Sequence, residues 1–198
     1  DIPTKTEFRN HDPSGALTPD IAKVLTKSPH LIPEAARRIL DANFPSSVHD
    51  DILAAVGLDM SEVQTVKRKK RDPAFRAKVL RAYEHRCAVC GFDLRLGKSD
   101  LALEAAHIKW HQAGGPDTEA NGLALCALHH KLLDRGAYSV ADDHRVIVSQ
   151  EVFGASGFED VLLRYMGEPL RSPQLESYIA DIRYLRWHRA EVFWNPAR

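Results

Sequence analysis

Residues 101–111 read LALEAAHIKWH and residues 121–130 read NGLALCALHH, and these two stretches decide the fold of most of the chain. The first predicts a short, largely apolar β-strand that carries His107 near its end. The second leads through a loop into a short helix over about 126–134. Residues 111–120, between them, form a polar loop marked by glycine and proline. Strands and helices are therefore expected in one α+β fold.

Four residues of metal-ligand type surround these stretches: Cys87, Cys90, Cys126 and His129. They form two pairs, each with two residues between its members, and 35 residues separate the pairs. Three cysteines and one histidine make a tetrahedral set that zinc accepts. We predict a structural Zn²⁺ whose binding, on the order of 10 kcal/mol in zinc-finger peptides, would help this region to fold. The alternative is three buried free thiols that act as small hydrophobes.

A histidine, an asparagine and a second histidine occur in this order, with the zinc ligands interleaved, so residues 83–138 resemble the HNH endonucleases. The resemblance implies two strands and a helix around a catalytic metal, Mg²⁺ or Mn²⁺. His107 would be the general base that activates water, Asn121 would hold the loop that keeps His107 aimed, and His130 would bind the metal. An imidazole with a pKa of about 6.5 suits the first role. The alternative for His107 is a structural histidine.

The position directly before His107 departs from the family pattern. Many HNH enzymes carry Asp, Glu or His there as a further metal ligand, whereas this chain has Ala106. Glu104, two residues back on the same strand face, is the expected substitute. Asp134 follows His130 by four residues on the predicted helix, so the two share one face and are expected to share the metal. The alternative for Asp134 is a surface acid at a helix end.

The charge of the chain is zero overall but unevenly distributed. The 198 residues include 27 Lys and Arg against 27 Asp and Glu, which by itself disfavours a uniformly basic nucleic-acid binder. Residues 1–60 hold six basic and nine acidic residues, a net of −3, whereas residues 67–81 hold eight basic and one acidic. The basic run is either a solvated linker or a set of phosphate contacts. It consists of Lys67, Arg68, Lys69, Lys70 and Arg71.

The N-terminal part is predicted to contain three short helices, opened by Thr18-Pro19, Pro33 and Ser47. It resembles the last third of a sulfur-binding domain, found in restriction enzymes directed at phosphorothioate-modified DNA. The resemblance rests on residues 3–7 (PTKTE), 15–19 (GALTP) and above all 44–53 (FPSSVHDDIL), and the C-terminal 187–198 (WHRAEVFWNPAR) looks like the ending of those enzymes. The earlier part of such a domain is not recognisable, and the chain begins with Asp1, so we expect an N-terminally truncated member.

This second resemblance implies that Phe44, Pro45 and Val48 contribute to an apolar pocket that faces the sulfur of the DNA. Sulfur is larger and less strongly hydrated than oxygen, so an apolar wall penalises an ordinary phosphate more than a modified one. The alternative is that the three residues form a hydrophobic turn that packs two helices together. With the pocket incomplete, recognition of modified DNA is expected to be weak.

Three regions are expected: residues 1–59 as the C-terminal part of a mostly helical recognition domain, 60–72 as a basic linker, and 73–198 as a zinc-stabilised HNH nuclease domain. The last is expected to end in a helical extension opened by Ser172-Pro173. The expected function is metal-dependent hydrolysis of double-stranded DNA, directed at phosphorothioate-modified sites. Cleavage of both strands by a chain with one nuclease site would favour a homodimer. The alternatives are a DNA-binding module with weak or no catalysis, motivated by Ala106, and a nicking or homing-type enzyme for unmodified DNA.

The expected cellular location is the bacterial cytoplasm. No stretch of about 18 uninterrupted apolar residues occurs that would span a membrane. The N-terminus lacks a signal-peptide pattern, and three cysteines do not form a closed disulfide framework. We therefore expect DNA as the partner and no membrane association.

Overall fold

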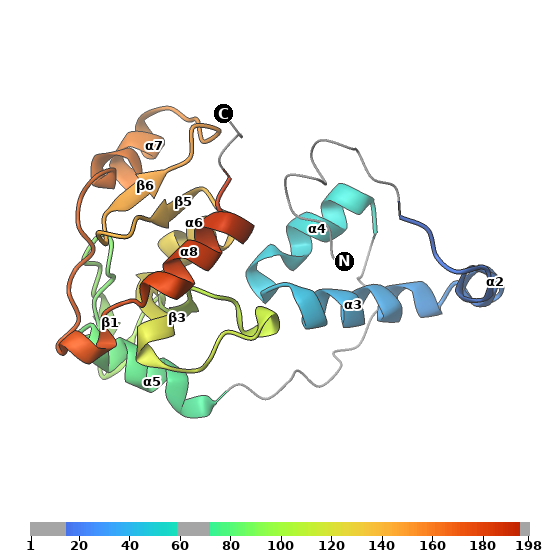
Figure 1. Cartoon of the computed structure of the whole chain (residues 1–198), viewed down its shortest axis with the longest axis horizontal. Helices are drawn as coiled ribbons and strands as arrows, with labels where there is room; N and C mark the ends of the chain where they lie inside the picture. The colour runs from blue at the N-terminus through green and yellow to red at the C-terminus, as the bar shows by residue number, and fades with distance from the viewer. Residues whose placement is uncertain (1–14, 59–71, 195–198) are drawn as a thin grey trace. The chain divides into compact units, whose positions relative to one another are not determined.

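The structure, a computed structural model, describes residues 15–58 and 72–194 (Figure 1). The chain divides into two compact units with the boundary between Arg68 and Lys69, and each unit is described by itself. The basic run at 67–71, predicted to contact phosphates, and the motif at 3–7 lie outside the described residues. No helix in the described ranges is both long and apolar enough to cross a membrane.

The N-terminal unit contains the helices α2 (Pro19–Lys27), α3 (Leu31–Asn43) and α4 (His49–Val56), with the 3-10 turn η1 (Ser46–Val48) before α4. Two of the predicted helix starts are wrong. The second helix begins at Leu31, two residues before Pro33. The third helix begins at His49, because Ser47 lies inside the 3-10 turn η1 that precedes it.

The core of this unit is small. In its described part the buried residues are Leu40, Pro45 and Val48. Apolar side chains on all three helices remain exposed, namely Ile21, Val24, Ile39 and Val56, and so does Leu17 just before α2.

A β-hairpin with a helix on either side forms the centre of the C-terminal unit. Strand β3 (Leu103–His107) pairs antiparallel with β4 (Gly122–Cys126), and His107 lies opposite Gly122. Helix α6 (Ala127–Asp134) follows β4 directly and contacts both strands, as does α5 (Pro73–Ala82). A two-stranded hairpin followed by a helix is the predicted α+β arrangement, which the structure confirms.

Strand β4 occupies a stretch that we expected to be a loop. All five of its residues are buried, and its backbone pairs with β3 along the whole strand. A short apolar run is compatible with a strand, a loop or a buried helix segment, and only the pairing partner decides among them. The expected loop after Asn121 is therefore wrong.

Helix α5 begins at a side-chain cap, since the Asp72 carboxylate accepts the backbone N–H of Ala74 at 2.9 Å. The helix lies so close to β4 that only glycine fits at position 122. A β-carbon there would come within 2.4 Å of Val79 Cγ2. This close approach brings Phe75 of α5 next to the end of β3.

The rest of the unit surrounds this centre. It contains the strand pairs β1 (Arg95–Leu96) with β2 (Ser99–Asp100) and β5 (Tyr138–Val140) with β6 (Val146–Val148), and the helices α7 (Ser156–Val161) and α8 (Ile182–Glu191). Short 3-10 turns connect them: η2 (His111–Ala113), η3 (Glu119–Asn121), η4 (Leu163–Tyr165) and η5 (Glu176–Tyr178). The buried His188 of α8 fixes α8 against its neighbours, because its ring nitrogens lie 2.7 Å from Ser139 Oγ and 3.0 Å from the Leu133 carbonyl.

The helix predicted from Ser172-Pro173 begins ten residues later, at Ile182, with Asp181 as its cap. Backbone hydrogen bonds explain the difference. The N–H of Gln174 donates to Ala82 O at 2.8 Å, and that of Asp181 donates to Ala120 O at 2.9 Å. These bonds to other elements use backbone donors that a continuous helix would need for itself.

Candidate active site and zinc centre

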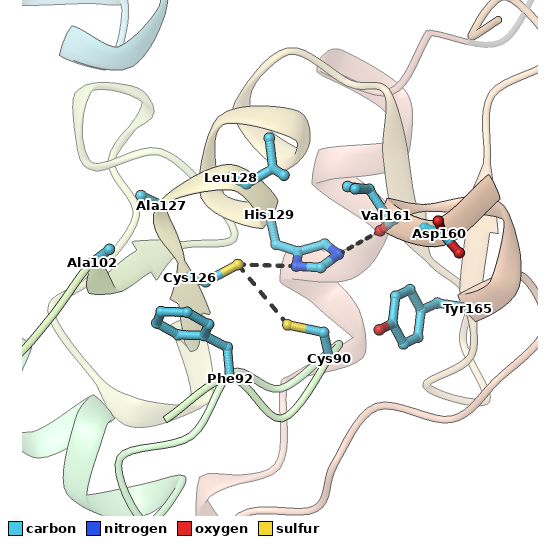
Figure 2. A pocket seen from close by; sticks show the side chains of 10 residues that line it. All are labelled: Cys90, Phe92, Ala102, Cys126, Ala127, Leu128, His129, Asp160, Val161 and Tyr165. Carbon is cyan, nitrogen blue, oxygen red and sulfur yellow. Dashed lines mark hydrogen bonds between the residues drawn. The ribbon is translucent and has the colours of Figure 1, made fainter. Parts of the chain in front are cut away.

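The four predicted zinc ligands come together in the C-terminal unit. Cys87 and Cys90 lie in the turns after α5, Cys126 ends β4 and His129 lies in the first turn of α6. Their donor atoms all lie within 4.8 Å of one another. Figure 2 shows three of the four side chains, those of Cys90, Cys126 and His129. Elements that are far apart in sequence therefore deliver one group of three sulfurs and one nitrogen.

The spacing of these donors fits a zinc ion. Zinc–sulfur bonds of about 2.3 Å in a tetrahedron separate two sulfurs by about 3.8 Å. The sulfurs of Cys90 and Cys126 are 4.0 Å apart, and His129 Nδ1 lies 3.7 Å from Cys87 Sγ and 3.1 Å from Cys126 Sγ. Four protein donors leave no open position, so a zinc ion bound here would be structural.

The other ring nitrogen of His129 forms a hydrogen bond with the backbone of α7. Nε2 donates to the carbonyl oxygen of Val161 at 2.9 Å, which places the ring proton there and turns Nδ1 toward the thiols (Figure 2). The tyrosine hydroxyl of Tyr138 donates to the backbone oxygen of His129 at 3.1 Å. Sequence reasoning missed Val161, because a backbone carbonyl leaves no mark in a residue pattern.

The zinc ligands shift one another's pKa values toward a charged pair. Burial alone would lower the pKa of His129, but the Cys126 and Cys87 sulfurs raise it to about 10. Contacts with Cys126 and then Cys90 hold the pKa of the Cys87 thiol well below its usual range. A thiolate and an imidazolium are therefore expected without metal, and zinc binding must displace the imidazolium proton from Nδ1.

An open pocket of about 430 Å³ adjoins the zinc ligands. Its wall is mostly carbon, from Phe92, Leu128 and Val161 among others, and Tyr165 closes one side (Figure 2). An apolar surround of this kind limits the access of water to bound metal.

The predicted general base, His107, ends β3 and has a side chain that is only 8% exposed. Its Nε2 lies 2.7 Å from the carboxylate oxygen Oδ1 of Asp117, in the loop that follows β3. The ring of Phe75 stacks on the imidazole with 4.0 Å between centroids. His111 Nε2 lies 4.0 Å from the other carboxylate oxygen of Asp117, Oδ2. Asp117 was absent from the sequence prediction, since nothing distinguishes it from other loop acids.

The fully buried side chain of Asn121 bridges the loop that leads from β3 to Asp117. Its Oδ1 accepts the backbone N–H of Lys109 at 2.9 Å, and its Nδ2 donates to the carbonyls of Lys109 and Pro116, both at 3.0 Å. Gly115 lies so close that a β-carbon would come within 1.9 Å of the Lys109 carbonyl oxygen. The amide thus ties both ends of the loop together, and its catalytic role stays a prediction.

The predicted ligands of the catalytic metal lie next to one another on the opposite face of β3 from His107. His130 Nδ1 lies 2.5 Å from Glu104 Oε2, and His130 Nε2 lies 3.3 Å from Asp134 Oδ2. The hydrogen bond to His130 lowers the pKa of the Glu104 carboxyl. Ala106 is fully buried opposite Leu123, which leaves Glu104 as the strand residue that reaches this group.

The imidazole of His130 separates the two carboxylates, so the three side chains do not converge on one point. Within residues 15–58 and 72–194, the Cys87, Cys90, Cys126 and His129 group is the one set of three or more such side chains whose donors lie within metal-binding range of one another. The assignment of Glu104, His130 and Asp134 as metal ligands stays a prediction.

The predicted sulfur-pocket residues lie between α3 and α4. Phe44 is half-buried, while Pro45 and Val48 are buried. His49 Nε2 donates to the Phe44 carbonyl oxygen at 2.9 Å, and this bond closes the turn. The turn connects α3 and α4, and the contact of its residues with sulfur stays a prediction.

A β-hairpin and helix with a strand-end histidine, a buried asparagine and a Cys₃His group define the HNH class of nucleases. Comparison with protein families agrees: residues 87–141 match the HNH endonuclease family. Residues 1–61 match the ScoMcrA-like DNA sulfur-binding domain. The chain therefore carries an HNH endonuclease domain preceded by a segment of the DNA sulfur-binding family, as its sequence motifs predicted.

One similar solved structure is that of the modification-dependent TagI restriction endonuclease. The two are 23% identical in sequence, and the match covers 73% of this chain with a TM-score of 0.46. It covers 44% of the solved chain, so this chain spans less than half the length of that relative. Among curated proteins there is no match.

Proposed function

We propose that this chain is a metal-dependent endonuclease that hydrolyses double-stranded DNA in bacterial restriction and is directed at phosphorothioate-modified sites. The observation that carries the proposal is the His107 imidazole at the end of β3, held 2.7 Å from a carboxylate inside a segment that matches the HNH endonucleases. A histidine held in this way suits proton transfer from water near neutral pH.

Each polar group near β3 then has a role. His107 takes the proton of the attacking water, and Asn121 fixes the loop that keeps His107 in place. His130, with Glu104 or Asp134, would hold Mg²⁺ or Mn²⁺, because carboxylate and imidazole donors suit these ions. When bound, the ion would offset the charge of the scissile phosphate. The Cys₃His group would hold Zn²⁺ and stabilise the fold.

The proposed substrate follows from the N-terminal unit. The match of residues 1–61 to the DNA sulfur-binding family supports modified DNA as the partner. The half-buried Phe44, with the buried Pro45 and Val48, would supply the apolar contact that favours sulfur over oxygen, and the basic run 67–71 would contact phosphates. Paired cleavage of both strands by a chain with one nuclease site would favour a homodimer. The proposed location is the bacterial cytoplasm.

A second candidate is a zinc-stabilised DNA-binding module with little catalysis. It is favoured by Ala106, which supplies no ligand, and by the hydrogen bonds that separate Glu104 from Asp134 across His130. A nicking or homing-type enzyme for unmodified DNA is the third candidate.

Cleavage of matched duplexes, with and without phosphorothioate groups, tests these candidates in Mg²⁺ or Mn²⁺. Wild type is expected to cut the modified duplex and His107→Ala to cut neither, while both keep the same zinc content and a cooperative melting transition. Equal cutting of both duplexes by wild type would support the third candidate. Binding without cutting under all conditions would overturn the nuclease proposal and support the DNA-binding module.

A further inference from the structure

We propose that Asp117 is a positioning residue that fixes the tautomer of His107, so that Nε2 carries the ring proton and Nδ1 is the basic nitrogen. This inference rests on the proposed function of His107 and assigns a role to a residue in the loop between β3 and β4. Its basis is the 2.7 Å contact between His107 Nε2 and Asp117 Oδ1.

A carboxylate determines the tautomer because it only accepts hydrogen bonds. A neutral imidazole has one N–H, so its contact with Asp117 places the proton on Nε2 and the lone pair on Nδ1. Burial alone would raise the pKa of Asp117, but the backbone N–H of Asp72 and then His107 lower it. The carboxyl is therefore ionised near neutral pH and available as an acceptor.

Asp117 is held in place from several sides. Its second oxygen, Oδ2, accepts the backbone N–H of Asp72 at 3.0 Å, at the start of α5. The residue before it, Pro116, is bound through its carbonyl by Asn121. Phe75 stacks on the imidazole and opposes rotation of the ring away from the carboxylate. Both partners of the hydrogen bond are thus fixed by separate contacts.

The charged groups near the pair are few in the described part of the unit. His111 lies 4.0 Å from Asp117 Oδ2 in the same loop. On the α5 side, Asp72 caps the helix and pairs with Lys78 at 3.2 Å. Asp117 is a negative group in direct contact with the imidazole, and it favours the imidazolium that forms when His107 takes a proton.

Asp117→Asn separates this role from simple packing. Asp117 lies between two donors, the Asp72 N–H and the His107 Nε2–H, and a carboxylate accepts both. The amide of Asn has one oxygen. When that oxygen accepts the Asp72 N–H, the NH₂ group faces His107 Nε2. An NH₂ donor at that place favours the tautomer whose proton is on Nδ1. By analogy with the buried aspartate of serine proteases, cleavage should fall roughly 10³-fold or more.

The pH profile gives a second readout. Without the carboxylate, the protonated form of His107 is less favoured. The acid limb of the cleavage profile should therefore shift by about 1 pH unit or more toward lower pH in Asp117→Ala and Asp117→Asn. Asp117→Glu should restore part of the rate and the wild-type position of the limb. Glu119→Gln, which removes an acid two residues away, is the matched control and should change neither.

The experiment combines cleavage with NMR of the full chain. Nitrogen-15 spectra report the tautomer of His107, which is identified among the ten histidines by its loss in His107→Ala. We expect the Nε2–H form in wild type and the Nδ1–H form in Asp117→Asn. A wild-type Nδ1–H form, or an Asp117→Asn variant with the wild-type tautomer, rate and acid limb, would overturn the inference. Full cleavage by His107→Ala would instead overturn the proposed function, while the NMR result would still decide the tautomer.

Discussion

The imidazole of His107 stacks on the phenyl ring of Phe75, with the ring centroids 4.0 Å apart and the planes inclined by 13°. Phe75 comes from α5 and His107 from the end of β3, so the contact depends on the packing of the helix against the hairpin. That packing in turn depends on Gly122, whose missing side chain leaves room for Val79. The orientation of the predicted base is therefore set by the core of the C-terminal unit.

Truncation of the stacked ring should affect stability and cleavage together. Phe75 is buried, and Phe75→Ala should lower the free energy of unfolding by about 3–5 kcal/mol, as is usual for a core phenylalanine. Phe75→Leu should keep most of that stability but still lose the ring stack. Thermal melting and cleavage rates of the two variants separate the effects, and an unchanged rate in Phe75→Leu would show that the stack is dispensable.

Loss of one zinc ligand should unfold the C-terminal unit. Cys90→Ser and His129→Ala each remove a donor from a group whose zinc would contribute folding energy on the order of 10 kcal/mol. We expect about one zinc per chain in wild type, removed by chelators only with loss of the cooperative melting transition. His130→Ala, which changes the neighbouring histidine, is the control and should keep its zinc. Metal analysis and circular dichroism provide the measurements.

Gly115→Ala should break the loop that Asn121 holds. The new β-carbon would overlap the Lys109 carbonyl oxygen and crowd Nδ2 of the buried Asn121, in the loop that follows His107. Overpacking of this kind costs about 1–3 kcal/mol of stability, and we expect most of the cleavage activity to be lost. Gly157→Ala in α7 meets no atom within 4 Å and should leave the melting temperature equal or slightly higher. Equal activity in the two variants would contradict the role of the loop.

Acid should remove the stability that Asp117 contributes. Its pKa is lowered in the folded chain, so its contribution is fully present above the unfolded value of about 3.9 and is lost as pH falls through the lower folded value. The difference in melting temperature between wild type and Asp117→Asn should therefore be largest above about pH 5 and shrink below pH 4. A difference that stays constant across this range would show that the carboxylate charge plays no part.

Local spacing in the sequence was enough to predict the zinc group. Two Cys/His pairs, each with two intervening residues, place their donors on tight turns whatever the rest of the chain does, and the four side chains converge as predicted. The start of α5 was also readable, because the Asp72 cap acts on the N–H of Ala74, two residues away. Such features depend on residues a few positions apart in the chain, so they can be predicted from the sequence.

Other features were decided by partners that are distant in sequence. Strand β4 is a strand because β3 pairs with it, and α8 begins at Ile182 because the preceding backbone bonds to Ala82 and Ala120. Likewise, Asp117 matters for His107 only because Asn121 and α5 fold the loop back onto the imidazole. Residue identity determined which groups were available for metal binding and proton transfer, and the tertiary structure determined which of them meet, since hydrogen bonds and close packing act across space.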